Sequence, residues 1–389
     1  MASPFNPIQL GRTRLRNRIV MSPMTRSRAH GPAASPNPLM ATYYAQRAGA
    51  GLIVTEGIQP NPIGQGYPST PGLHNRTQIA AWRQVTDAVH ARGGVIFAQL
   101  MHTGRVGHPT NYAEAYHPEA VAGSATARAS QAPLETRKTP ATPVGPSPIA
   151  AQGQIFTASG LQDFVTPVAL TDAGITQTIT DFADAAANAI DAGFDGVELH
   201  GANGYLLHQF LSTNANQRTD KWGGSVENRT RMIIETTRAV AETIGAERTA
   251  LRISPGNPLN DITEDDYRQT YPRVLTALDP LGLAYLHVLE STDPQFTQDL
   301  RQAWRGVFVL NPSTPGSRTG PEHLRLVEDG DSDLVSFGSL FIANPDLPER
   351  LRTHAPLAQP DMTKAYGGDA AGYTDYPTMH GDLEREATA

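Results

Sequence analysis

One short segment of the sequence gathers side chains that could polarise and protonate a small molecule. An apolar run ends at His200, and Asn203 and Tyr205 follow it across two glycines. His200 and Asn203 could both donate a hydrogen bond to one oxygen, which is the arrangement of an oxyanion site. Tyr205, whose phenol has an ordinary pKa of about 10, could deliver a proton. Spacing alone favours a plainer interpretation, a polar turn in which His200 and Asn203 cap the helix that follows.

The segments around this turn predict a closed barrel of alternating strands and helices. Amphipathic helical patterns cover Gln78–Ala91, Thr176–Ala192 and Ser225–Ile244. Eight short apolar runs predict strands at Arg18–Met21, Leu52–Glu56, Val95–Leu100, Gly196–His200, Leu251–Ser254, Tyr285–Glu290, Val307–Leu310 and Leu334–Phe337. Eight strand–helix units in this length favour an α/β fold, the (β/α)8 TIM barrel. An open dinucleotide-binding sheet would have a glycine-rich turn after its first strand, and this chain has Ser22-Pro23-Met24-Thr25 there.

Polar residues recur at the C-terminal ends of the predicted strands, where a barrel carries its active site. They are Thr25, Glu56, Gln99, His200, Glu290 and Asn311. Alternation along Gly196–His200 places Glu198 and His200 on one face of their strand, with the intervening residues toward the helices. Arg252 lies within its strand. Interior Glu198, Arg252 and Glu290 are equally consistent with a charge network that fills the barrel.

The chain is predicted to form one domain, a barrel over residues 1–389 with two additions. The connection between the third and fourth strands is long and rich in Ala, Ser, Thr and Pro, so we expect an insertion or lid at about residues 108–150. The Gly- and Tyr-rich tail predicts an extended C-terminal arm at about residues 357–389. Asn344 and Pro345 are typical of a helix start, with Asn as the N-cap of the last helix.

Composition excludes several kinds of chemistry. The 389 residues contain no cysteine, which rules out disulfides, thiolate nucleophiles and iron–sulfur clusters. No His spacing suggests a metal site. The formal net charge of −7 argues against a nucleic-acid partner, no apolar run is long enough to span a membrane, and the N-terminus lacks a signal-peptide pattern. We therefore expect a cytoplasmic protein that acts on a small molecule, with no metal, nucleic-acid or membrane partner.

A series of motifs along the chain, taken together, is similar to one known family. They are Ser22-Pro23-Met24-Thr25-Arg26, Tyr44-Ala45-Gln46-Arg47-Ala48, Thr55-Glu56-Gly57, Gln99-Leu100-Met101-His102-Thr103-Gly104-Arg105, the stretch from His200 to Arg229, Ala343-Asn344-Pro345-Asp346-Leu347 and the Tyr-Gly tail. In this order they resemble the Old Yellow Enzyme family over nearly the whole chain, apart from the long insertion. The resemblance implies an FMN enzyme on a (β/α)8 barrel, in which NADH or NADPH reduces the flavin. Hydride then passes to the β-carbon of an activated alkene, such as an α,β-unsaturated carbonyl compound.

The resemblance also assigns residues to the flavin. Pro23, Thr25, Gly57, Gln99 and Arg252 fall at flavin-contacting positions. Thr25 would hydrogen-bond the ring, Gln99 would bond its pyrimidine edge, and Arg252 would place positive charge where the reduced ring becomes anionic. Capping or hydrogen bonding at the barrel mouth remains an alternative for both Thr25 and Gln99.

The substrate side is assigned in the same way. His200 and Asn203 would bind the carbonyl or nitro oxygen, and Tyr205 would protonate the α-carbon. Met101 would lie in the substrate pocket at a place that the family often gives to a bulky aromatic residue. Tyr366 would line the same pocket, although a simple packed aromatic explains it nearly as well.

The chain departs from the family where the FMN phosphate is held. The family has a glycine pair after the seventh strand, and here Pro312 and Pro315 have no N–H to donate. After the eighth strand the family has Phe-Gly-Arg, with the arginine paired to the phosphate. This chain has Gly338 and Ser339 there, which loses a charge-assisted contact. Arg318 could substitute from the altered turn.

Three functions therefore remain open. The leading hypothesis is an FMN-dependent, NAD(P)H-using ene-reductase. An alternative is a flavin-free barrel of the same family that catalyses a non-redox isomerisation, cyclisation or elimination. A non-catalytic binding protein is the least favoured, because both donors and the acid are retained. The sequence indicates neither the physiological substrate nor the oligomeric state.

Overall fold

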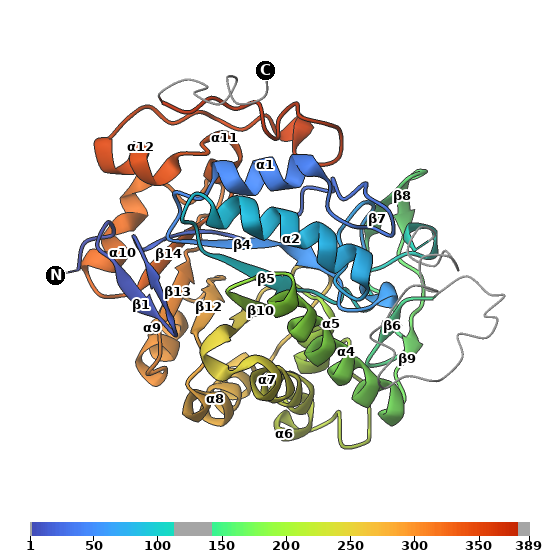
Figure 1. Cartoon of the computed structure of the whole chain (residues 1–389). Coiled ribbons are helices and arrows are strands. Elements are labelled where there is room, and N and C mark those ends of the chain that lie inside the picture. Colours follow the sequence, from blue (N-terminus) through green and yellow to red (C-terminus); the bar gives the residue numbers. More distant parts are fainter. Residues whose placement is uncertain (1, 113–141, 380–389) are drawn as a thin grey trace.

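The computed structural model describes residues 2–112 and 142–379 of the chain. Its centre is a closed barrel of parallel strands in the order β10-β11-β12-β13-β14-β3-β4-β5, which confirms the predicted (β/α)8 TIM barrel (Figure 1). In chain order its strands are β3 (Ile19–Met21), β4 (Leu52–Ile58), β5 (Ile96–Leu100), β10 (Gly196–Gly201), β11 (Thr249–Ile253), β12 (Tyr285–Leu289), β13 (Phe308–Asn311) and β14 (Leu334–Phe337). Each overlaps a predicted strand.

Helices surround the barrel because the strands carry apolar residues on their outer faces. Val197 and Leu199 of β10 belong to the large buried cluster that joins strands to helices, while Glu198 and His200 between them point inward as predicted. The helices are α1 (Pro38–Gln46), α2 (Arg76–His90), α4 (Asp172–Asp191), α5 (Leu206–Leu211), α6 (Val226–Arg229), α7 (Arg231–Ile244), α8 (Tyr267–Leu278), α9 (Pro294–Ala303), α10 (Arg325–Glu328), α11 (Ser339–Ala343) and α12 (Leu347–Thr353). None of the helices in the described ranges is long and apolar enough to cross a membrane.

The N-terminal hairpin closes one end of the barrel. Strands β1 (Ile8–Leu10) and β2 (Thr13–Leu15) pair antiparallel, and Leu10 and Leu15 are buried in the smaller apolar cluster inside the barrel. This cluster fills the end at which the barrel strands begin. The opposite end, where the strands finish, is thereby left for a site.

The long connection after β5 contains short strands of its own. β6 (Val144–Gly145) pairs with β9 (Val168–Ala169), and β7 (Gln154–Thr157) forms a hairpin with β8 (Gly160–Asp163). Residues 113–141 of the predicted insertion lie outside the described residues. The predicted division into one domain, a lid and an arm remains a prediction.

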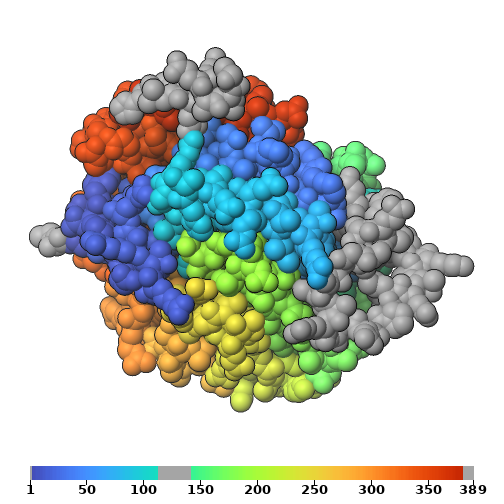
Figure 2. All heavy atoms as spheres, in the orientation of Figure 1, coloured from blue at the N-terminus to red at the C-terminus, as the bar shows by residue number. Residues whose placement is uncertain are grey.

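The C-terminal arm lies beside the first helix, although they are more than 300 positions apart in sequence. In Figures 1 and 2 the red segment after α12 borders the blue region of α1, and the Gln46 side-chain amide donates to the carbonyl of Thr374. Two buried arginines hold the arm from beneath. Arg26 donates to the carbonyls of Ala365 and Gly372, and Arg28 donates to five carbonyls, four of them on the arm. A single 3-10 turn, Met362–Lys364, interrupts the otherwise irregular described part of the arm.

Two local predictions are wrong. Asn344 does not begin the last helix, because its side-chain amide donates to the carbonyls of Leu340 and Ala358 and its oxygen accepts from the Ala358 N–H. It therefore ends α11, and Asp346 precedes α12. Glu56 was expected at the mouth of the barrel, but a register shift between β4 and β5 follows Val54, and the Glu56 carboxylate is buried beside the Tyr44 hydroxyl.

Candidate active site

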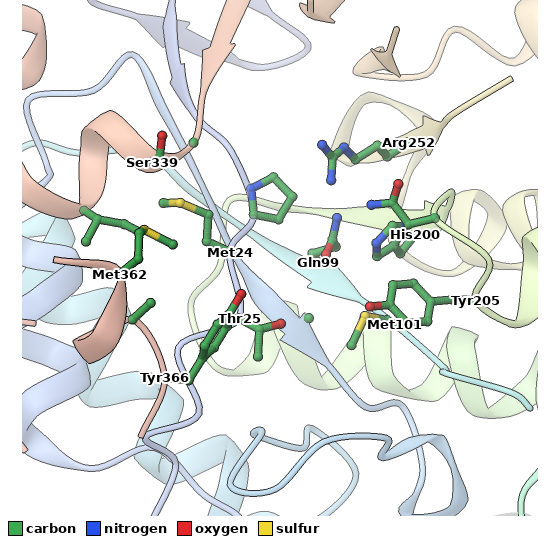
Figure 3. A pocket seen from close by; sticks show the side chains of 16 residues that line it. Met24, Thr25, Gln99, Met101, His200, Tyr205, Arg252, Ser339, Met362 and Tyr366 are labelled. Atoms are coloured by element: carbon green, nitrogen blue, oxygen red, sulfur yellow. The ribbon is translucent and has the colours of Figure 1, made fainter. Parts of the chain in front are cut away.

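A cavity of about 330 Å³ opens at the C-terminal end of the barrel strands (Figure 3). All the site residues expected from the sequence line it: Pro23, Thr25, Gly57, Gln99, Met101, His200, Asn203, Tyr205, Arg252, Gly338, Ser339 and Tyr366. Met24, Ile342, Met362 and Ala365 complete the lining. The structure therefore brings the candidates from six barrel strands and the C-terminal arm into one pocket.

His200 is placed to donate a hydrogen bond into this pocket. It stands near the end of β10, and its Nδ1 accepts from the backbone N–H of Ala202 at 3.3 Å. Burial, reinforced by the positive charge of Arg252, brings the pKa of His200 well below its usual value. The ring is therefore neutral, and with Nδ1 accepting, its proton sits on Nε2. That N–H is a donor without positive charge.

The Asn203 side chain is oriented by a hydrogen bond from a neighbouring amide. Its side-chain oxygen accepts from the Asn257 side-chain amide at 3.3 Å, so its own amide N–H groups remain for the pocket. Its backbone has φ of 58°, a left-handed conformation that asparagine tolerates better than most residues. The next residue, Gly204, also has positive φ, and a Cβ there would lie 2.5 Å from the carbonyl oxygen of Leu259. Only glycine fits this turn.

The capping interpretation of the turn is wrong. Tyr205 is the N-cap residue of α5, and no side chain caps that helix. His200 and Asn203 use their side chains elsewhere, so their spacing is not explained by a helix start.

Tyr205 is buried against a second tyrosine. Its hydroxyl lies 3.0 Å from the hydroxyl of Tyr67, and its ring packs edge-on against His200 with centroids 4.9 Å apart. Burial, together with the neighbouring Tyr67, raises the pKa of Tyr205 well above its usual value. The phenol therefore keeps its proton at neutral pH and is available as a proton donor.

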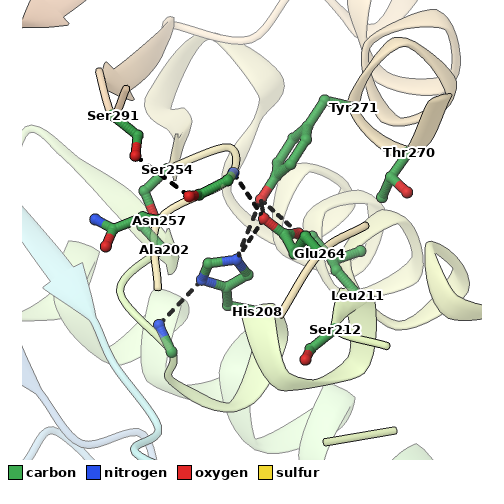
Figure 4. A network of polar contacts seen from close by, with 12 residues as sticks. Ala202, His208, Leu211, Ser212, Ser254, Asn257, Glu264, Thr270, Tyr271 and Ser291 are labelled. Atoms are coloured by element: carbon green, nitrogen blue, oxygen red, sulfur yellow. Dashed lines mark hydrogen bonds and ion pairs between the residues drawn. The ribbon is translucent and has the colours of Figure 1, made fainter. Parts of the chain in front are cut away.

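Behind the turn lies a buried polar network that the pocket does not touch (Figure 4). His208 of α5 accepts the backbone N–H of Gly204 on Nδ1 at 3.0 Å, so its Nε2–H faces the Glu264 carboxylate, also 3.0 Å away. Glu264 further accepts from the Tyr271 hydroxyl and the Gly256 N–H, both at 3.0 Å. His208, Glu264 and Tyr271 thus connect the turn to the loop after β11 and to α8, and they fix its position.

The floor of the pocket joins a charge network inside the barrel. Gln99 donates from its side chain to Glu198 at 2.8 Å, which leaves the Gln99 side-chain oxygen for the pocket. Glu198 also contacts His287 at 2.9 Å. Burial alone would raise the pKa of Glu198, but His287 and Arg252 outweigh it and bring the pKa below the usual value. Glu198 therefore belongs to the charge network inside the barrel, and Arg252 both interacts with that network and lines the pocket.

Arg252 brings a buried cation to the same side. It donates to the Asn311 side-chain oxygen at 3.0 Å, and its Nε is buried with no hydrogen-bond partner among the described residues. An unpartnered buried guanidinium N–H is unfavourable unless a ligand accepts from it. This orphaned donor fits an electron-rich ring edge.

The opposite side of the pocket, which we call the serine end, consists of Met24, Gly338, Ser339, Ile342 and Met362. Figure 3 places Ser339, Met24 and Met362 together, across the cavity from Arg252 and His200. Among the described lining residues, Arg252 is the one with a permanent charge. Arg318 is exposed, donates to the Gln359 side chain at 2.8 Å and does not line the pocket, so the expected substitution for the phosphate arginine is not seen.

Several residues in or beside the site carry no signal in the sequence. Tyr67, which contacts Tyr205, lies in a loop after β4 in Gln65-Gly66-Tyr67, a segment with no periodic signal. Asn260 donates to the carbonyl of Asn203 at 2.7 Å from 57 residues away, and Met362 enters from the arm. Tyr366 lines the pocket with 67% of its surface exposed, so the packed-aromatic interpretation is wrong.

Comparison with known proteins agrees with this geometry. Residues 3–358 match the model of the NADH:flavin oxidoreductase / NADH oxidase family. The chain belongs to this family. The predicted relation to Old Yellow Enzyme is thereby confirmed, and the protein is an Old Yellow Enzyme-like ene-reductase by family.

Individual relatives cover almost the entire chain. A 12-oxophytodienoate reductase of rice, Oryza sativa subsp. japonica, is 39% identical, over 96% of this chain and 94% of that protein. A chanoclavine-I aldehyde reductase of Penicillium roqueforti is 38% identical over 97% and 96%. Among solved structures, the Old Yellow Enzyme homologue of Zymomonas mobilis has a TM-score of 0.86 with 35% identity over 97% of this chain and 99% of that one. Morphinone reductase has a TM-score of 0.86 with 38% identity over 99% and 98%.

Proposed function

We propose that the protein reduces activated alkenes with hydride from FMN and a proton from Tyr205, using NADH or NADPH as reductant. The observation that carries the proposal is the convergence of His200 Nε2–H, the Asn203 amide and the Tyr205 hydroxyl on one cavity beside Arg252. The substrates are small molecules with a conjugated carbonyl or nitro group. A cytoplasmic location belongs to the same proposal.

His200 and Asn203 bind the substrate oxygen. When hydride adds to the β-carbon, the alkene electrons move toward the carbonyl and the oxygen gains negative charge. Two preorganised donors aimed at that oxygen lower the activation barrier, because they stabilise the charge as it develops. A neutral His200 suits this task, since it donates a hydrogen bond to the oxygen without carrying a positive charge itself.

Tyr205 supplies the proton to the α-carbon. Its raised pKa keeps the hydroxyl protonated before the reaction. The Tyr67 hydroxyl, 3.0 Å away, can donate to the phenolate oxygen that remains. Water can restore the proton after the product leaves.

The ring side of the pocket fits an isoalloxazine. Thr25 and the Gln99 side-chain oxygen offer polar partners, and Arg252 offers its orphaned Nε–H. A flavin held by these residues would supply the redox chemistry, the transfer of hydride from the nicotinamide to the alkene. The serine end lacks a matching cation for the phosphate.

That neutral serine end also favours a second function, the flavin-free alternative. With no flavin, the same oxyanion donors and tyrosine acid support isomerisation, cyclisation or elimination. The two functions differ in their need for a bound chromophore.

The visible spectrum of the purified protein separates them. The proposal expects flavin absorbance after incubation with FMN and removal of free ligand, followed by oxidation of NADH or NADPH that depends on added cyclohex-2-enone. A matched variant, Arg252→Met, removes the orphaned donor and should lower flavin occupancy. Protein that stays colourless with excess FMN contradicts the proposal and leaves the non-redox alternative.

A further inference from the structure

The two sides of the pocket recognise different parts of any ligand that spans it. The side at Arg252, Gln99 and His200 is polar and carries the permanent charge. The serine end is lined by Met24, Ile342 and Met362, with the Ser339 hydroxyl as its polar side chain. A ligand with a polar ring and a tail would place the tail at the serine end.

A phosphate on that tail would also fall at the serine end. In (β/α)8 barrels, phosphate groups are bound by the loops that follow the seventh and eighth strands. Here these strands are β13 and β14, and their loops begin at Pro312 and Gly338. The polarity of these two loops therefore decides how strongly a phosphate is held.

The loop after β13 offers little to an anion. Pro312 and Pro315 have no N–H. The N–H of Ser313, between them, already donates to the Glu290 carboxylate at 2.9 Å. The Glu290 carboxylate therefore already uses the N–H that a phosphate could have bound. Its negative charge also opposes the binding of a second anion at the same loop.

The loop after β14 offers a neutral hydroxyl among apolar side chains. A phosphate monoester carries about −1.5 to −2 charges near pH 7. Moving such a charge from water to a site with no opposite charge is unfavourable, whereas an uncharged hydroxymethyl group is accommodated without this loss. Arg318, the cationic residue of the altered turn, is exposed and donates to the Gln359 side chain.

We infer that this pocket selects its flavin by the ring alone and binds riboflavin, the uncharged flavin alcohol, about as tightly as FMN. The inference rests on the proposed flavin function and adds to it the form of cofactor that the chain accepts. A phosphate held by a charge-assisted pair would give FMN an advantage of roughly 10- to 100-fold. This pocket lacks the residues for that advantage.

Equilibrium dialysis of flavin-stripped protein against riboflavin and against FMN tests the inference without any turnover. The two dissociation constants should agree within about threefold, and added salt should change them equally, because no phosphate ion pair is screened. An advantage of tenfold or more for FMN overturns the inference and leaves the proposed function standing. Binding of neither flavin overturns both.

Ser339→Arg and Ser339→Gln form a matched pair for the same measurement. The arginine adds a cation to the serine end and should raise the FMN-to-riboflavin affinity ratio at least about tenfold. Glutamine adds similar length without charge and should leave the ratio unchanged. An unchanged ratio in Ser339→Arg overturns the inference, because the phosphate would then lie elsewhere. If that variant does not fold, Glu290→Gln should raise the ratio by removing the opposing carboxylate, and no rise overturns the inference.

Discussion

The two ends of the pocket are built in different ways. At the polar end each donor is held by a second contact: His200 by the Ala202 N–H, Asn203 by Asn257, and the turn between them by His208. At the serine end Met24 and Met362 contribute flexible thioether side chains, and Met362 is 50% exposed. Preorganised donors suit charge that develops in a reaction, whereas adaptable apolar walls suit the binding of varied ligand tails. Chemistry and ligand accommodation are thus divided between the ends.

The largest expected effect comes from removing the acid at the polar end. Tyr205→Phe should lower the turnover of an enone by about 10²- to 10⁴-fold, because the α-carbon loses its positioned proton donor. Flavin binding should be retained, since Tyr205 is not among the expected ring contacts. Steady-state kinetics with cyclohex-2-enone measure the loss. Tyr67→Phe is the control and should lose far less; a larger loss in Tyr67→Phe would assign the acid to Tyr67.

Removing an oxygen donor at the same end should have the next largest effect. His200→Ala should reduce turnover by about 10²- to 10³-fold, as expected for one donor of an oxyanion site. Asn203→Ala should act similarly, and the pair should not add fully because both serve one oxygen. Near-normal turnover in either single variant would contradict the proposed binding of the substrate oxygen.

The network behind the turn should matter less than the donors it positions. His208→Leu leaves the Gly204 N–H without its acceptor and removes one of the donors to the Glu264 carboxylate. The variant should lower kcat by about 10- to 100-fold through misplacement of Asn203 and Tyr205. His208→Gln keeps an acceptor and a donor, and should recover most of the activity.

Separate measurements of kcat and KM at a known concentration of folded protein distinguish a positioning role of His208 from loss of folded protein. Both His208 variants are compared at equal folded concentration, established by circular dichroism. If His208→Leu has a normal kcat, or if His208→Gln recovers nothing, the network does not position the turn.

The smallest expected effect concerns the support of the serine end. Glu56 lies beside Tyr44 and the backbone N–H of Arg26, whose side chain holds the arm that carries Met362, and burial raises the pKa of Glu56 from 4.5 to about 7. At pH values between about 4.5 and about 7, the folded protein therefore keeps a proton on Glu56 that the unfolded chain has lost. The contribution of Glu56 to the free energy of unfolding falls as the pH rises through this range.

Glu56→Gln should remove this pH dependence of the free energy of unfolding. The wild type should lose of order 2 kcal/mol across this range relative to the variant, as measured by urea unfolding at about pH 5 and about pH 8. Parallel pH dependences in the two proteins would contradict the raised pKa. Turnover at the polar end should change little in this variant.

The elements of the fold were predictable because each strand is a compact apolar run, and most of these runs have a polar residue at the end. The spacing from His200 to Tyr205 also indicated the chemistry of the polar end, since one strand end and one turn position all three residues. Contacts between distant segments were not predictable. From the loop after β11, Asn260 contacts Asn203 and Glu264 contacts His208. The periodicity of the sequence does not indicate such pairings.

Local backbone irregularities explain the other errors. A register shift in β4 turns Glu56 away from the pocket, although its position at the end of the predicted strand had placed it at the mouth of the barrel. Asn344 has the residue type of a helix start, but its amide bonds to Ala358 decide its role. Propensity is overridden here by one tertiary contact.

Product analysis tests the central claim, alkene reduction at the polar end, most directly. The protein with bound flavin is incubated with cyclohex-2-enone and NADH or NADPH, and the product is identified by mass spectrometry alongside nicotinamide consumption. The claim predicts cyclohexanone, heavier than the substrate by two hydrogen atoms, formed in equal amount to the nicotinamide oxidised and nearly abolished in Tyr205→Phe. Conversion of the enone to a product of unchanged mass, or no dependence on Tyr205, would contradict it.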